Sequence, residues 1–145
     1  MDEHRRLAFA TFVEQKTEAA LSATIRSLTT VVDRNTDSDF IGVGNSWTRL
    51  HYDGDFGLTV APVNGTSLSL VFVQSRDGNT EAVDPSEFGA GPTDTHLIYE
   101  GLSRVAADAV LAGAGTVHPT AFFSVWHPEL VALRESLGLP RHPVD

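Results

Sequence analysis

The 145-residue chain contains no cysteine, which excludes disulfide bonds and thiolate metal ligands. It also lacks any apolar run near the roughly 18–20 residues that a membrane-spanning helix needs. Two arginines lie close to the N-terminus, but neither an apolar segment nor a small-residue cleavage site follows them, so we expect no signal peptide. Together these absences predict a cytoplasmic protein that does not bind membranes.

Positive charge is scarce. Lys16 is the only lysine, and with nine arginines it leaves a formal net charge of −9. A general negative field repels nucleic-acid phosphates and anionic lipid surfaces, so we expect neither as a partner. A phosphorylated small molecule would have to be held locally, by individual arginines and backbone N–H groups.

The first sixty residues favour a helix followed by a connecting segment. Apolar residues recur at helical spacing up to Val32, which predicts a helix over residues 3–32. A polar, turn-rich run over 33–39 then reads as a loop, and residues 45–63 as irregular with one short strand. We therefore expect an N-terminal unit, 1–60, and an α/β unit, 61–145.

The second unit has the pattern of a βαβ motif. Residues 67–74 end in a continuous apolar run, typical of a strand buried on both faces, and residues 109–112 form a second such run. Between them, Thr93 is a candidate N-cap for a crossover helix. Two strands joined in this way are expected to be parallel. A last helix is predicted from Pro128 to about Gly138.

Both predicted strands end in sharp turns, and ligands of open parallel sheets bind at such ends. The first turn, 75–78, carries Asp77, whose carboxylate could hydrogen-bond a substrate hydroxyl or a nicotinamide edge. The second, 113–116, has two glycines that let backbone N–H groups approach a ligand. Each also has a purely structural interpretation, because Asp-Gly and Gly-rich pairs are common in turns.

Arg104 and the histidines also bear on function. Arg104 lies near the end of the predicted crossover helix, either as a solvated charge that suits the helix dipole or as a ligand for phosphate or carboxylate. The six histidines show no pairwise metal-ligand spacing, so we expect no metal site. No nucleophile with a base at a recognisable spacing supports a hydrolase.

The motif order V-Q-S-R-D-G, G-P-T-D and L-S-R-V-A-A-D-A-V-L-A-G-A-G-T-V resembles the bacterial RibD C-terminal domain and its stand-alone pyrimidine-reductase relatives. The resemblance covers residues 68–117 and is closest over 102–117. It implies a dihydrofolate-reductase-like fold, of which we expect this chain to carry the N-terminal half. Arg76 replaces a leucine of the family pattern, and residues 1–30 have no counterpart in it.

The resemblance implies hydride transfer from NADPH to the ribose carbon of a phosphoribosylamino-pyrimidine, with the cofactor supplying the hydride. Asp77 matches the family's aspartate beside the reacting groups, Ser75 its neighbouring serine, and Arg104 the arginine that binds substrate phosphate. The cofactor contacts match Gly113, Ala114, Gly115 and Thr116. Homodimerisation, or association with the remaining half of the domain, is also implied.

Two other functions remain open. A reductase derivative that has lost its activity could serve as a binding or assembly module, since an uncovered strand edge invites pairing with another chain. Alternatively, the reductase could act on dihydrofolate or on another small carbonyl or imine compound, because a fold does not fix the substrate.

Overall fold

The computed structural model describes residues 3–31, 40–59, 65–71, 74–78, 91–111 and 122–142. The elements are, in order, α1 (Glu3–Ser22), β1 (Phe40–Gly42), α2 (Ser46–His51), β2 (Gly57–Thr59), the π-helix η2 (Asp94–Leu102) and α3 (Pro128–Ser136). The fold is thus a mixture of helices with a small sheet. Within these ranges, no helix has both the length and the hydropathy to cross a membrane.

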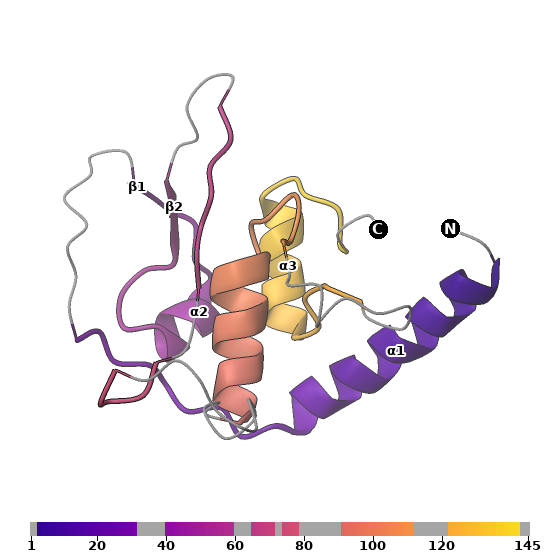
Figure 1. The fold of residues 1–145 in the computed structure, drawn as a ribbon, viewed down its shortest axis with the longest axis horizontal. Helices are drawn as coiled ribbons and strands as arrows, with labels where there is room; N and C mark the ends of the chain where they lie inside the picture. Colours follow the sequence, from indigo (N-terminus) through magenta and orange to yellow (C-terminus); the bar gives the residue numbers. More distant parts are fainter. Residues whose placement is uncertain are drawn as a thin grey trace.

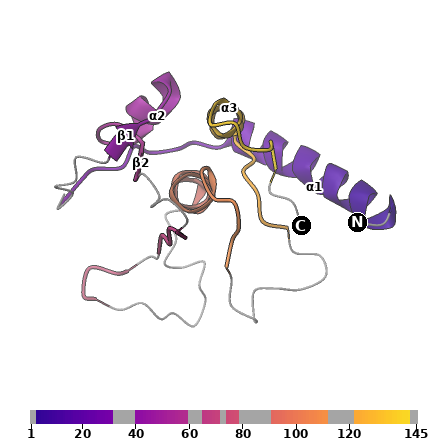
Figure 2. The same cartoon turned by 90° about the horizontal axis from the view of Figure 1, so that it is seen from above.

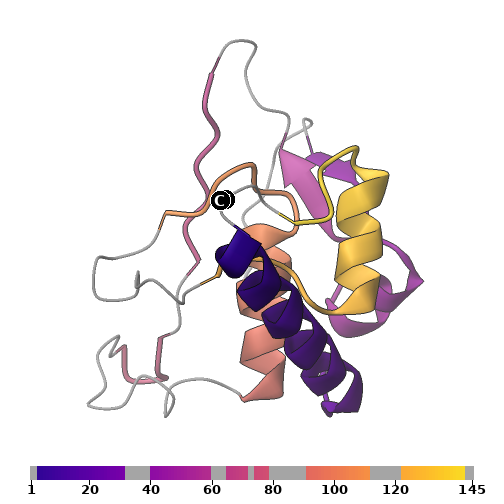
Figure 3. The ribbon, with the colours of Figure 1, turned by 90° about the vertical axis from the view of Figure 1, so that its right-hand side faces the viewer.

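Helices η2 and α3 lie side by side at the centre of the structure (Figures 1 and 3). Seen from above, α2 with β1 and β2 lies on one side of this pair and α1 extends on the other (Figure 2). The two strands pair antiparallel, with Ile41 opposite Leu58. The central pair therefore forms the framework on which the other elements are arranged.

The hydrophobic core lies around η2 and α3 and draws on residues from both sides of the predicted domain boundary at residue 60. Its buried members are Tyr52, Phe56, Leu97, Val105, Val125, Leu130, Val131 and Leu133. Ile25 and Leu28, from the segment after α1, pack against it. The division into two units stays a prediction.

Helix α1 is shorter than predicted: it ends at Ser22, and residues 23–31 are not helical. The reason is that backbone N–H groups of this segment find partners elsewhere in the fold. The N–H of Leu28 donates to the carbonyl of His51 at 2.8 Å, and that of Arg26 to the Thr93 hydroxyl at 2.9 Å. These long-range hydrogen bonds replace the intrahelical ones that the apolar spacing predicted.

The predicted parallel βαβ unit is not formed by the described residues. Residues 65–71 and 109–111 contain no strand, and their leucines are exposed, with Leu68 83% and Leu111 91% accessible. The small sheet instead joins β1 to β2, which neighbour α2 and pair antiparallel. An apolar run becomes a buried strand only when a neighbouring strand satisfies its backbone groups, and within these ranges none does so.

The short helix α2 was not predicted, although its start carries a local signal. Asn45 is the N-cap, and its side-chain oxygen accepts a hydrogen bond from the N–H of Thr48 at 2.9 Å. Asparagine is among the preferred N-cap residues because it satisfies one of the free donors of the first turn. The predicted short strand of this region corresponds to β2.

Helix α3 begins at Pro128 and stops before Gly138, as predicted. Pro128 suits the first turn, where its missing N–H costs nothing. Gly138 adopts a positive φ of 76°, its N–H donates to the carbonyl of Glu135, and the N–H of Leu139 donates to that of Arg134. This pair of bonds with a left-handed glycine is a Schellman motif, which ends a helix cleanly.

Helix η2 begins after Thr93, as predicted, but it has π rather than α geometry. The Thr93 hydroxyl makes no cap hydrogen bond; it is buried and accepts from Arg26 instead. The wider turns change which side chains face the core, since i→i+5 bonding shifts the helical repeat. Leu97 and Val105 are buried, whereas Leu102 is 43% exposed.

Gly101 permits the close packing of η2 on the loop after α2. A Cβ at this position would clash with the Tyr52 hydroxyl, which itself donates to the Leu97 carbonyl at 2.5 Å. We expect Gly101→Ala to destabilise the fold by about 1–3 kcal/mol, measured by chemical denaturation. A Tyr52→Phe background removes the clashing oxygen and should recover part of that loss. An equal unfolding free energy for Gly101→Ala and wild type would contradict this packing.

Candidate functional site

The turn at Ser75–Gly78 forms as the sequence predicts. The Gly78 N–H donates to the Ser75 carbonyl at 2.9 Å, and Gly78 adopts a positive φ of 90°, which glycine favours. The Ser75 hydroxyl donates to the Asp77 carboxylate, and the Asp77 residue is exposed. The turn therefore presents a carboxylate, with an adjacent hydroxyl, at the surface of the described structure.

Arg104 is neither a solvated charge nor an open ligand group: it is 9% exposed, just beyond the end of η2. Its Nη1 donates to the Ser124 carbonyl at 3.1 Å, and its guanidinium lies over the rings of Tyr99 and Phe123. Burial lowers the pKa of Arg104, against the opposing effect of the Glu100 carboxylate. The same residue thus links η2 to the segment 122–127.

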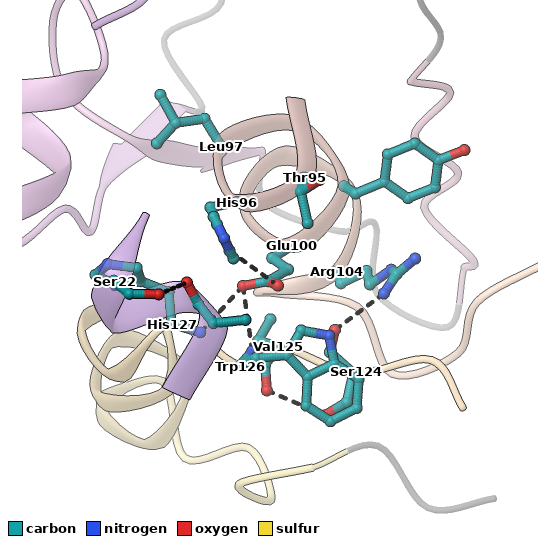
Figure 4. Close-up of polar contacts among 12 residues, drawn as sticks. Ser22, Thr95, His96, Leu97, Glu100, Arg104, Ser124, Val125, Trp126 and His127 are labelled. Atoms are coloured by element: carbon teal, nitrogen blue, oxygen red, sulfur yellow. Dashed lines mark hydrogen bonds and ion pairs between the residues drawn. The ribbon is translucent and has the colours of Figure 1, made fainter. Parts of the chain in front are cut away.

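The carboxylate of Glu100, on η2, is also deeply buried, at 1% exposed. One oxygen, Oε2, accepts hydrogen bonds from the N–H groups of Trp126 at 3.2 Å and His127 at 3.0 Å. The other, Oε1, lies 3.2 Å from Nδ1 of His96 (Figure 4). A buried carboxylate is tolerable only with such partners, and here they fasten 122–127 to η2.

His127 completes this polar cluster, together with aromatic residues of α2. Its ring stacks on Trp47, with centroids 4.2 Å apart, and lies 5.9 Å from the ring of His96. Burial is the main cause that lowers the pKa of His127 to about 4, and the neighbouring imidazoles of His96 and His51 lower it further. At neutral pH His127 is therefore uncharged.

Sequence reasoning missed this cluster. One signal was available, because His96 and Glu100 are four residues apart and so share one face of a helix. Their pairing with Trp126 and His127 spans 26 and 27 positions and leaves no local pattern. In the part of the chain that the structure describes, no group of three or more His, Asp or Glu side chains could hold a metal ion.

Only part of the predicted active site lies within the residues that the structure describes. Gly113, Ala114, Gly115 and Thr116 lie outside the described residues, so their approach to Asp77 stays a prediction. A shallow hollow of about 630 Å³ lies over the end of α1, between Glu14 and Ser22, and contains none of the predicted site residues. The described site residues are thus the surface carboxylate of Asp77, the Ser75 hydroxyl that donates to it, and the buried guanidinium of Arg104.

No protein-family model, curated protein or solved structure matches the chain.

Proposed function

We propose that this chain supplies part of the active site of a cytoplasmic, NADPH-dependent reductase of the riboflavin-biosynthesis type, with a dihydrofolate-reductase-like fold. The substrate would be a phosphoribosylamino-pyrimidine, and the working form a homodimer or an association with the remaining half of the domain. The observation that carries the proposal is the order of three motifs, 73–78, 91–94 and 102–117. Several short motifs in a fixed order are far more specific than any one of them.

The turn at Ser75–Gly78 supports the role given to Asp77. Its carboxylate is exposed and has the Ser75 hydroxyl beside it, so it suits a hydroxyl or amide donor of a ligand. When bound, NADPH would supply the hydride, and the chain's own groups would orient it against the sugar. The cofactor contacts would come from the 113–116 turn, whose glycines allow close backbone approach.

The buried environment of Arg104 qualifies its part in this proposal. With one Nη1 bond to the Ser124 carbonyl and two rings against its faces, the guanidinium is held in a fixed orientation. Because the Ser124 carbonyl and the Phe123 ring belong to segment 122–127, these contacts cover the guanidinium only while that segment stays in place. We propose that it reaches substrate phosphate when segment 122–127 shifts to admit the ligand.

The test is an NADPH oxidation assay on the polypeptide encoded by the full reading frame that contains this chain. Turnover of a phosphoribosylamino-pyrimidine above that of dihydrofolate would support the proposed substrate. Faster turnover of dihydrofolate than of the phosphoribosylamino-pyrimidine would favour a reductase that acts on dihydrofolate or on another carbonyl or imine compound. Absence of NADPH oxidation with every such substrate would reject the enzyme.

A binding or assembly module is the second candidate, favoured by the exposed apolar side chains of Leu68, Leu70 and Leu111, each more than 80% accessible. Exposed leucines favour association between chains when they gather into one apolar patch, so this candidate requires these three to do so. This candidate predicts a stable oligomer in sedimentation experiments together with no NADPH oxidation. A monomer that oxidises NADPH would exclude it.

A further inference from the structure

Segment 122–127 is attached to η2 through the Glu100 carboxylate and, just beyond the end of the helix, through Arg104. Glu100 accepts the backbone N–H groups of both Trp126 and His127, while its second oxygen is engaged by His96 (Figure 4). One oxygen thus accepts two N–H groups and the other faces His96. Glu100 favours a positive charge on His127, but burial and His96 disfavour that charge more strongly, so the pKa of His127 is lowered overall.

The imidazole of His127 lies in a site that does not suit a cation. It is 8% exposed and stacked on Trp47, and within the described structure its Nδ1 has no hydrogen-bond partner. The titratable groups that face it are His96 and Glu100 from η2 and His51 from α2. Two of these three are imidazoles, which repel a second cation whenever they carry a proton.

We propose that His96, Glu100 and His127 form a proton-operated latch: neutral His127 keeps segment 122–127 on η2, and protonated His127 releases it. A proton on Nδ1 would create a buried imidazolium without an acceptor. To serve as that acceptor, the Glu100 carboxylate would have to turn away from its present partners, which are His96 and the N–H groups of Trp126 and His127. Either outcome weakens the attachment of the segment, because an unpaired buried charge costs several kcal/mol.

The pKa of His127, lowered to about 4, fixes the direction and the window of the effect. The released segment has an ordinary histidine pKa near 6.5. Between these values the released form binds more protons than the closed form, so the latch is weakened as the pH falls from about 6.5 toward 4. Above pH 7 both forms are neutral at this position, and the latch is closed.

The two tryptophans of the chain, Trp47 and Trp126, both lie at the latch, so intrinsic fluorescence reports on it directly. We would follow fluorescence and amide hydrogen exchange of the whole chain from pH 7 to pH 4.5, with exchange corrected for its intrinsic pH dependence. The protection of the Trp126 and His127 amides should fall by roughly 10- to 100-fold. The protection of the amides in the middle of α3 should fall by a smaller factor.

His127→Gln should abolish this acid-dependent loss, because glutamine is polar but does not titrate. His4→Gln, on the exposed face of α1, is the control and should retain it. Should His127→Gln fail to fold, NMR titration of isotope-labelled histidines in the wild-type chain decides instead. The latch is supported if the His127 imidazole titrates with a midpoint near pH 4 and if the exchange protection of the Trp126 and His127 amides begins to fall below pH 6.5. A midpoint near 6.5, or unchanged acid sensitivity in His127→Gln, overturns it.

Discussion

Replacing Arg134 with methionine is expected to destabilise the chain by about 3–5 kcal/mol, a large part of the roughly 5–15 kcal/mol that stabilises a typical domain. The guanidinium is 1% exposed and satisfies carbonyl groups at the end of η2. Its Nη1 donates to the carbonyls of Arg104, Val105 and Ala107, the last at 2.7 Å, and its Nε donates to that of Pro140 at 2.7 Å. Methionine fills a similar volume but offers no donor.

The expected loss follows from the geometry of helix ends. The last carbonyls of a helix have no partner within it, and a cation there also meets the negative end of the helix dipole. Removing the donor leaves buried carbonyls unsatisfied, at about 1–3 kcal/mol each. The three that follow η2 depend on this one side chain from α3, so the contact between the two central helices depends on it as well.

Urea denaturation measures this effect, with Arg141→Met as the matched control. The Arg141 side chain is 62% exposed and forms a 4.0 Å ion pair with Glu135, so its replacement should change the unfolding free energy by less than about 0.5 kcal/mol. Similar unfolding midpoints for the Arg134 and Arg141 variants would contradict the role of Arg134 at the end of η2.

Asp77→Asn is expected to reduce the proposed reductase activity by about 10- to 100-fold. The reason is that asparagine keeps the size and turn preference of aspartate but lacks the charge, and a hydrogen bond to a charged group contributes about 1.5–3 kcal/mol. If the carboxylate acts mainly on the reacting state, kcat should fall more than KM rises. Steady-state NADPH oxidation measures both parameters.

Asp53→Asn is the control for this variant, since Asp53 also precedes a glycine in an exposed turn. Its carboxylate accepts the N–H of Thr30 at 3.0 Å, which gives it a structural role away from the proposed site. We expect Asp53→Asn to retain activity at a temperature where it stays folded. Equal losses in the two variants would show that a general disturbance, rather than the Asp77 carboxylate, explains the effect.

Features fixed by neighbouring residues were predictable from the sequence. The start of η2 after Thr93, the Asp77-Gly78 turn and the end of α3 at Gly138 each depend on residues within one or two turns of the chain. In these places the backbone conformation follows from proline, glycine and the preferences of turn residues.

Features that depend on distant contacts were not predictable in this way. The early end of α1 depends on hydrogen bonds from Leu28 to His51 and from Arg26 to Thr93, the latter 67 positions away. The burial of Glu100 depends on Trp126, which periodicity cannot anticipate. Leu68 and Leu111 were predicted to lie in buried strands but are exposed. An apolar pattern leads to a buried strand only if a partner strand is adjacent.

We propose, above all, that this chain belongs to a protein that binds reduced nicotinamide cofactor. The most direct measurement is a fluorescence titration with NADPH, using the polypeptide encoded by the full reading frame. We predict a saturable change in nicotinamide emission that NADP⁺ competes away and that Asp77→Asn weakens. Emission that stays linear with NADPH concentration into the millimolar range, with no competition by NADP⁺, would contradict the proposed function.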